Sequence, residues 1–132
     1  MKQLNGGKQM TDVWRLPAIA RWEKSCGKHP TQKPLAVLAR AILASTHKGA
    51  WILDPFAGSS TTGIAANLLN RKYLGIDKER EYLTISENRK HEIENLEMAE
   101  HYTDKIQDIS LYNRISTNMA DEPETEGYDL PF

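Results

Sequence analysis

The feature that most constrains the fold of this chain is a run of nine residues, 54–62, with the sequence DPFAGSSTT. A short apolar run at 50–53 precedes it, and a helical pattern at 63–69 follows it. This order predicts a strand, a tight turn of small residues and the N-terminus of a helix. Backbone amides at a helix N-terminus have no partner within the helix and attract anionic or polar ligand groups. We therefore expect a small-molecule site here, because small residues also let a ligand approach the backbone closely.

The turn differs from two common nucleotide-binding loops. No Gly-Lys-Ser/Thr sequence follows, so no lysine is placed to contact a phosphate as in a P-loop. Gly58 is followed by another glycine only at position 63, so the G-x-G-x-x-G fingerprint is also absent. A second short strand is expected to end in Asp77. In strand–helix–strand nucleotide-binding folds, an acidic residue at this place accepts hydrogen bonds from ribose hydroxyls.

The spacing of apolar residues and of turn residues predicts the other elements. The complete set is an extended segment at 12–16, a loop with three prolines at 17–34, helices at 35–46, 61–70, 79–101 and, more weakly, 104–114, and strands at 50–54 and 72–77. Gly49 is the stop signal of the helix at 35–46. The helix at 79–101 carries Tyr82, Ile85, Ile93 and Leu96 on one face.

Four separate motifs together resemble one protein family. They are VWRLP at 13–17, HPTQKP at 29–34, DPFAGSSTT at 54–62 and GID at 75–77. In this order and spacing they resemble the C-terminal half of a β-class DNA amino-methyltransferase, over residues 12–95. Such enzymes transfer a methyl group from S-adenosylmethionine to the exocyclic amino group of adenine (N6) or cytosine (N4). The resemblance implies a site-specific enzyme of a restriction–modification system. It also implies an α/β fold, a partial Rossmann-like methyltransferase with an incomplete parallel sheet flanked by helices.

The resemblance further implies a binding site for S-adenosylmethionine. The residues that it assigns to the cofactor are Thr31, Gln32, Lys33, Asp54, Phe56, Ala57, Gly58, Ser59, Ser60, Thr61 and Asp77. Asp77 would accept hydrogen bonds from both ribose hydroxyls, and Lys33 would reach the methionine carboxylate. Asp54 and the amides of residues 57–59 would hold the ammonium and the backbone groups of the methionine, or Asp54 would instead cap the turn. Phe56 would face the sulfonium through its π cloud or belong to the core.

The chain departs from the family pattern at two points. The family usually has Gly-Ser-Gly-Thr-Thr in the turn, where this chain has Ser60 in place of the second glycine. If that glycine has a positive φ or lies against the ligand, Ser60 costs about 1 kcal/mol or crowds the cofactor. The catalytic Asp/Asn/Ser-Pro-Pro-Tyr/Phe motif does not occur in these 132 residues, and DLPF at 129–132 lacks the first proline and follows an acidic stretch. We therefore expect no catalytic residue here, and cofactor binding at most by this chain alone.

Charge is distributed unevenly along the chain. Residues 1–91 contain 15 Lys and Arg against 7 Asp and Glu, whereas residues 92–132 contain 2 against 11. The basic part could contact the phosphates of double-stranded DNA, or its charges could simply solvate helix faces. We expect a disordered N-terminus at 1–11, a cofactor-binding body at 12–101 and an acidic, weakly helical to disordered tail at 102–132.

The sequence also bears on metals and on membranes. The histidines show no metal-ligand spacing with cysteines or carboxylates, so no metal is expected, and His29 before a proline is more typical of a structural or solvated residue than of a general base. No apolar run is long enough to span a membrane, which favours a cytoplasmic protein.

Two parallel strands joined by one crossover form a poor isolated sheet. In the family, the strand before the turn also pairs with the strand that carries the catalytic motif. We therefore expect the edge at 50–54 to be exposed and apolar, and covered by a chain with the missing catalytic half, by self-association or by the tail. Two other interpretations stay open: an inactive remnant or interaction module that keeps the fold without binding cofactor, and a methyltransferase of RNA or small molecules.

Overall fold

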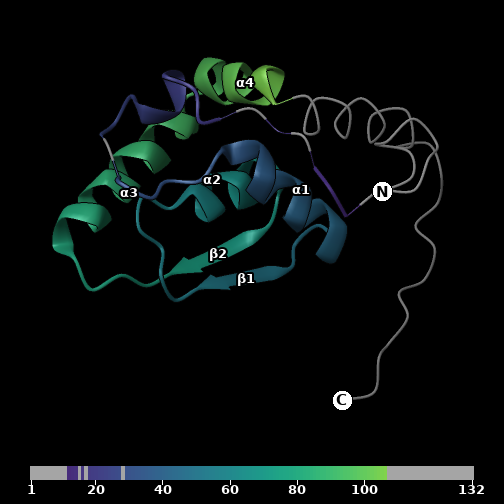
Figure 1. The fold of residues 1–132 in the computed structure, drawn as a ribbon, viewed down its shortest axis with the longest axis horizontal. Helices are drawn as coiled ribbons and strands as arrows, with labels where there is room; N and C mark the ends of the chain where they lie inside the picture. Colours follow the sequence, from purple (N-terminus) through teal and green to yellow (C-terminus); the bar gives the residue numbers. More distant parts are fainter. Residues whose placement is uncertain (1–11, 15, 17, 28, 107–132) are drawn as a thin grey trace.

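The computed structural model describes residues 12–14, 16, 18–27 and 29–106 (Figure 1). Its elements are the 3-10 helix η2 (Trp22–Lys24), α1 (Leu35–Ser45), β1 (Trp51–Asp54), α2 (Thr61–Leu68), β2 (Lys72–Gly75), α3 (Arg80–Glu94) and α4 (Leu96–Lys105). The predictions for residues 1–11 and 107–132 lie outside the described part of the chain.

The two strands form a parallel sheet, with α2 as the crossover between them. Trp51 pairs with Lys72, and Asp54 pairs with Gly75. The labelled helices all lie on the same side of the two strands in Figure 1. The predicted α/β fold with an incomplete parallel sheet is confirmed, with its described helices on one side of the sheet.

The hydrophobic core lies among α1, α2 and α4. Its buried members are Leu35, Ala39, Ile42, Ile64, Ala65, Ala66, Leu69, Tyr102 and Ile106. The three from α1 are spaced at i, i+4 and i+7, so they form one apolar stripe along that helix. The small residues of α2 let neighbouring elements approach its backbone, and an added Cβ at Gly63 would lie only 2.5 Å from Cε1 of Tyr73. This close packing holds β2 against α2.

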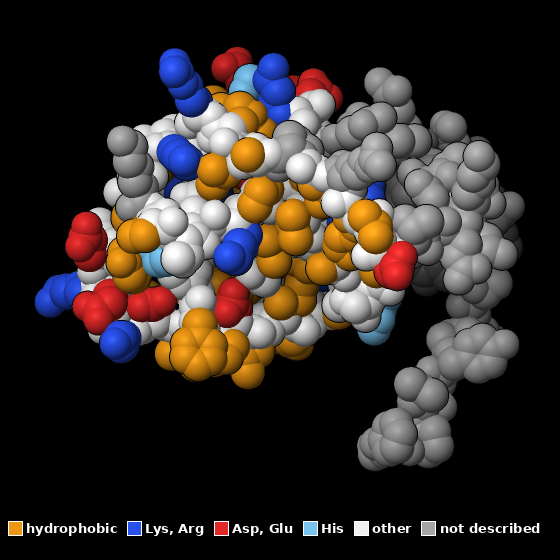
Figure 2. All heavy atoms as spheres, in the orientation of Figure 1, with side chains coloured by type: hydrophobic (Ala, Val, Ile, Leu, Met, Phe, Trp, Pro, Cys, Tyr) orange, Lys and Arg blue, Asp and Glu red, His pale blue; other side chains and the backbone are white. Residues whose placement is uncertain are grey.

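The other face of the sheet is largely apolar and open to solvent, with Lys72 placed so that its Nζ lies 5.5 Å from the centroid of the Trp51 ring. Side chains alternate between the faces of a strand, and the exposed fractions are 69% for Trp51, 62% for Leu53, 54% for Leu74 and 53% for Ile76. Figure 2 shows hydrophobic side chains gathered along the side of the molecule where β1 and β2 lie. Among the described residues, β1 pairs with β2 alone. The prediction of an exposed, apolar edge at 50–54 is therefore confirmed.

The single helix predicted at 79–101 is wrong, because it is broken at Asn95. This residue is extended (φ −76°, ψ 122°), and its side-chain oxygen accepts hydrogen bonds from the backbone amides of Glu97 and Met98. Asparagine is a strong N-cap residue, so it ends α3 and begins α4. Leu96, which was predicted on the apolar face of one long helix, is exposed as the first residue of α4.

Two further boundaries differ from the prediction. The cofactor-binding body was predicted to end at residue 101, but Tyr102 and Ile106 are buried core residues. The weaker helix predicted at 104–114 does not start at Asp104, which belongs to α4, and its residues from 107 onward lie outside the described part. The loop predicted at 17–34 contains η2, whose Trp22 packs edge-on against Tyr102 with ring centroids 4.9 Å apart.

Candidate functional site

The turn after β1 contains two residues in the left-handed region of the backbone. Gly58 has φ 51° and Ser60 has φ 52°. The amide of Ser60 donates to the carbonyl of Ala57 at 2.8 Å and closes the turn. The amide of Ala57 donates to the carbonyl of Ile76 at 2.9 Å, which ties the turn to the chain just after β2. The position where the family has its second glycine therefore does require a positive φ, and Ser60 carries the steric cost of its Cβ.

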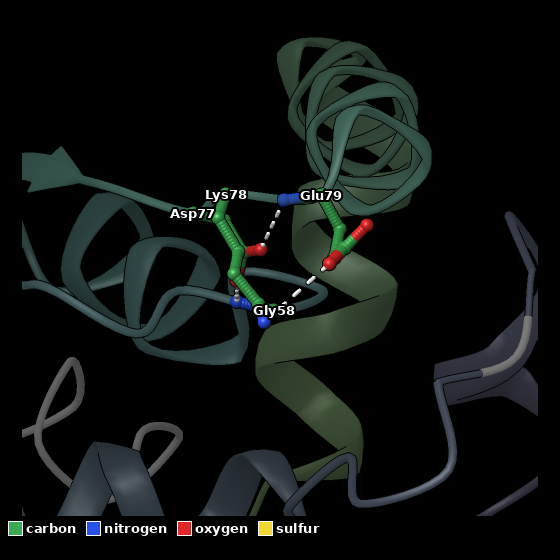
Figure 3. Close-up of polar contacts among 4 residues, drawn as sticks. All are labelled: Gly58, Asp77, Lys78 and Glu79. Carbon is green, nitrogen blue, oxygen red and sulfur yellow. Dashed lines mark hydrogen bonds and ion pairs between the residues drawn. The ribbon is translucent and has the colours of Figure 1, made fainter.

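Both carboxylate oxygens of Asp77 accept hydrogen bonds from backbone amides (Figure 3). Its Oδ2 accepts from the amide of Gly58 at 2.8 Å, and its Oδ1 accepts from the amide of Glu79 at 2.9 Å. These two hydrogen bonds, with that from Glu79 the larger cause, lower the pKa of Asp77 below its usual value. Through the same two hydrogen bonds, Asp77 fixes the turn to the chain just after β2. Each carboxylate oxygen keeps a second lone pair for another donor.

Asp54 also supports the turn. Its Oδ2 accepts from the hydroxyl of Thr62 at 2.7 Å, and its Oδ1 accepts from the amide of Phe56 at 3.1 Å. These contacts match the alternative in which Asp54 caps the turn. Phe56 itself is 87% exposed, so the alternative that placed it in the core is wrong.

A cavity of about 180 Å³ lies between the turn and the HPTQKP segment. Its lining residues are His29, Thr31, Gln32, Lys33, Leu38, Asp54, Phe56, Ala57, Gly58, Ser59, Thr61 and Thr62. The fold thus brings together two motifs that are far apart in the sequence. Of the residues predicted to bind the cofactor, only Ser60 and Asp77 do not line this cavity.

The HPTQKP segment is held in place by the buried carboxylate of Glu23. Its Oε2 accepts from the amide of Leu35 at 2.7 Å, at the start of α1, and its Oε1 accepts from the amide of Ala20 at 3.0 Å. The side-chain amide of Gln32 donates to the backbone carbonyl of Glu23 at 2.7 Å. A carboxylate at a helix N-terminus is favourable because it faces unpaired amides and the positive end of the helix dipole.

His29 forms part of the cavity wall. Its Nδ1 accepts from the amide of Thr31 at 3.2 Å, and its ring packs at 60° to that of Tyr82 with centroids 4.2 Å apart. A Cβ added to Gly58 would lie 3.0 Å from Nε2 of His29, so glycine lets this ring close against the turn. These contacts support the structural interpretation of His29.

Ser60 does not line this cavity. Its hydroxyl is 3.3 Å from the hydroxyl of Tyr73. Ser60 lines a second cavity, of about 220 Å³, among α2, β2 and α3. Position 60 therefore has the positive φ that the sequence suggested, whereas its side chain does not crowd the first cavity.

Arg89 is a site residue that the sequence did not reveal. It is 2% exposed, and its Nη1 donates to the carbonyl of Ser59 at 2.6 Å and to the hydroxyl of Thr61 at 3.0 Å. Burial lowers the pKa of its guanidinium from the usual value. One turn earlier in α3, the hydroxyl of Ser86 lies 2.9 Å from the carbonyl oxygen of Gly58. An arginine within a charged helix is typical of a solvated face, so composition gave no reason to place it beneath the turn.

Glu92 continues this row of polar residues along α3. Its carboxylate accepts hydrogen bonds from the hydroxyl of Tyr102 at 2.8 Å, from the hydroxyl of Ser25 at 2.9 Å and from the thiol of Cys26 at 3.1 Å. We call Ser86, Arg89 and Glu92 the α3 polar stripe. They are three residues apart, which places them on neighbouring turns of one helix face. The stripe joins the turn after β1 to the 25–26 loop and to α4.

Within the described ranges, no group of three or more His, Cys, Asp or Glu side chains is arranged to hold a metal ion. None of the helices in that part of the chain combines the length and the apolar character that crossing a bilayer requires.

Comparison with known proteins connects this architecture to a family. The profile of the DNA methylase family matches residues 1–88. The type II methyltransferase M2.MboI of Moraxella bovis is 62% identical over 93 residues, which make up 70% of this chain and 34% of that protein. The type II methyltransferase M2.DpnII of Streptococcus pneumoniae is 57% identical over 89 residues, 67% of this chain and 33% of that protein.

The chain spans about a third of the length of these curated relatives. Among solved structures, the M1.HpyAVI–SAM complex is 42% identical and aligns with a TM-score of 0.47 over 50% of this chain and 33% of that chain. Because the family profile covers more than half of the sequence, including both strands and the turn between them, the chain belongs to the DNA methylase family.

Proposed function

We propose that this chain is the S-adenosylmethionine-binding portion of a DNA amino-methyltransferase that modifies adenine at N6 or cytosine at N4 in a restriction–modification system. Membership of the DNA methylase family and similarity to two type II methyltransferases support the reaction class. The activity, substrate and partners belong to a whole enzyme about three times as long as the matched region. They are therefore part of this proposal.

The observation that carries the proposal is the shared cavity of the HPTQKP segment and the turn after β1. The cavity offers a cation from Lys33, a carboxylate from Asp54 and an exposed aromatic ring from Phe56. These groups complement the carboxylate, the ammonium and the sulfonium of the methionine part of the cofactor. The carboxylate of Asp77, beside the turn, would accept hydrogen bonds from the ribose hydroxyls. Each of these four roles is proposed.

Methyl transfer to a base needs the base out of the stack and its amino group aligned with the methyl donor. The Asp/Asn/Ser-Pro-Pro-Tyr/Phe motif that does this in the family does not occur in the 132 residues. We therefore assign cofactor binding and placement to this chain, and base binding to a segment that carries the motif. That segment, or a second copy of the chain, would cover the open sheet face around Trp51, Leu53 and Leu74. Double-stranded DNA would bind the assembled enzyme.

Calorimetric titration of the chain with S-adenosylmethionine tests the cofactor role. We expect saturable binding that Asp77→Asn weakens about tenfold or more, because a charge-assisted hydrogen bond contributes about 1.5–3 kcal/mol. Lys78→Ala is the matched control, since the neighbouring Lys78 side chain is exposed and contacts only the Glu79 carboxylate, at 3.7 Å, among the contacts described. Thermal unfolding of each variant separates a loss of affinity from a loss of fold.

An absence of binding at millimolar cofactor would reject the cofactor role of the chain alone and favour an interaction module. The enzymatic part of the proposal has its own test. The chain is mixed with a polypeptide that carries the Asp-Pro-Pro-Tyr motif of a DNA methylase, and transfer of a labelled methyl group to DNA is measured. We expect transfer only with both polypeptides present. Transfer to RNA in preference to DNA would contradict the proposed substrate.

A further inference from the structure

Gly58 and Ser59 in the turn, and Thr61 at the start of α2, contact side chains of α3 or of Asp77, which lies three residues before α3. The amide of Gly58 donates to Asp77 at 2.8 Å, and the carbonyl of the same residue is 2.9 Å from the hydroxyl of Ser86. The carbonyl of Ser59 and the hydroxyl of Thr61 both accept from Arg89. The turn after β1 is therefore held by α3 rather than by its own sequence alone.

Arg89 contacts residues that line the cavity but does not line the cavity itself. Ser59 and Thr61 line the cavity of about 180 Å³, whereas Arg89 does not. All its hydrogen bonds among the described residues are made by Nη1, and Nε and Nη2 are buried without a partner there. These two buried donor nitrogens without acceptors offset part of the stability that the Nη1 hydrogen bonds contribute, so the role of Arg89 lies in its contacts with Ser59 and Thr61.

We propose that Arg89 is a positioning residue for cofactor binding. By donating to the Ser59 carbonyl and the Thr61 hydroxyl, it fixes the turn with Gly58 and Ser60 in the left-handed region, and so shapes the cavity before the ligand arrives. Pre-organisation of this kind raises affinity because less ordering remains to be done on binding. The binding part of this inference rests on the proposed cofactor role, while its structural part does not.

The chain offers a matched control for the test. Arg71 is also buried, and its guanidinium donates to the backbone carbonyls of Leu69 and Thr46, at the opposite end of α2 from the turn. We compare Arg89→Met and Arg71→Met by two measurements. The first is the dissociation constant for S-adenosylmethionine at a temperature where both variants are folded. The second is amide hydrogen exchange at Gly58 and Ser60 in the chain without ligand.

Both methionine variants are expected to lower the melting temperature. Only Arg89→Met is expected to speed exchange at Gly58 and Ser60 and to weaken cofactor binding, each about tenfold or more, since a hydrogen bond from a charged group is lost. Arg89→Lys is expected to recover part of both effects, because an ammonium can still donate to the Ser59 carbonyl.

Unchanged hydrogen exchange at the turn in Arg89→Met would overturn the inference. An effect of Arg71→Met on exchange or on affinity as large as that of Arg89→Met would also overturn it. If the wild-type chain does not bind S-adenosylmethionine, the cofactor role of the chain fails, and the exchange measurement alone decides whether Arg89 holds the turn. Faster exchange only in Arg89→Met would then retain the structural part, that Arg89 holds the turn, while its part in cofactor binding would fail.

Discussion

Replacing Ser60 by glycine and by alanine measures the strain in the turn after β1. Both variants lose the contact of 3.3 Å with the Tyr73 hydroxyl, so this contribution cancels in their difference. At φ 52° the Cβ of alanine costs about 1–2 kcal/mol, which glycine avoids. Glycine in turn loses about 0.5–1 kcal/mol more backbone entropy on folding. We therefore expect Ser60→Gly to be more stable than Ser60→Ala by about 0.5–1 kcal/mol, or about 3–6 °C in melting temperature.

Thermal and urea unfolding followed by circular dichroism measure this difference directly. An alanine variant as stable as the glycine variant would refute the reasoning, because it would mean that position 60 is not held in the left-handed region. Cofactor affinity supplies an independent check. Since the Ser60 side chain does not line the cavity of about 180 Å³, both variants should bind S-adenosylmethionine within about threefold of the wild type, well under 1 kcal/mol.

Three other predictions follow from contacts described above. The pKa of Asp77 is lowered, so its ionised carboxylate stabilises the fold above about pH 4, and this contribution disappears as the pH falls through the lowered pKa. The urea midpoint should therefore fall more steeply below about pH 4 in the wild type than in Asp77→Asn. Burial raises the pKa of Tyr102 to about 12, so its stabilisation is complete below pH 10 and is lost between pH 10 and about 12. Tyr102→Phe should lower the free energy of unfolding by about 1–2 kcal/mol at pH 7, because the hydrogen bond to Glu92 is lost, and by progressively less above pH 10. A loss that does not depend on pH would contradict this prediction. Gly63→Ala should lower the free energy of unfolding by about 1–3 kcal/mol, because the new Cβ would lie 2.5 Å from the Tyr73 ring. In a double-mutant cycle, Gly63→Ala should cost much less when Tyr73→Leu is also present. An equal loss with and without Tyr73→Leu would exclude the clash.

The sequence predicted the central strand–turn–helix–strand unit because its signals are local. An apolar run, a turn of small residues and a helical pattern lie next to one another, and the strands begin and end within two residues of the predicted positions. The convergence of the HPTQKP segment on the turn came from the family resemblance, because no local pattern relates residues 29–33 to residues 54–62.

The two main errors have different physical origins. The apolar spacing continues past Asn95, but the side chain of that residue accepts hydrogen bonds from two backbone amides just after it and breaks the helix, a local capping signal that the apolar periodicity does not report. Arg89 was overlooked because helix periodicity treats arginine as a solvated residue. Its burial depends on acceptors about 30 positions away, on Ser59 and Thr61, which no one-dimensional pattern reports.

The open sheet face has a consequence for the temperature dependence of stability. The heat capacity change of unfolding grows with the apolar surface that unfolding newly exposes to water. Trp51, Leu53 and Leu74 are already more than half exposed in the folded chain, so they add little to that change. The stability curve of the chain should therefore be flatter than that of a domain of this length with both sheet faces covered. Any polypeptide that covers this face would raise both the stability and the curvature of that dependence.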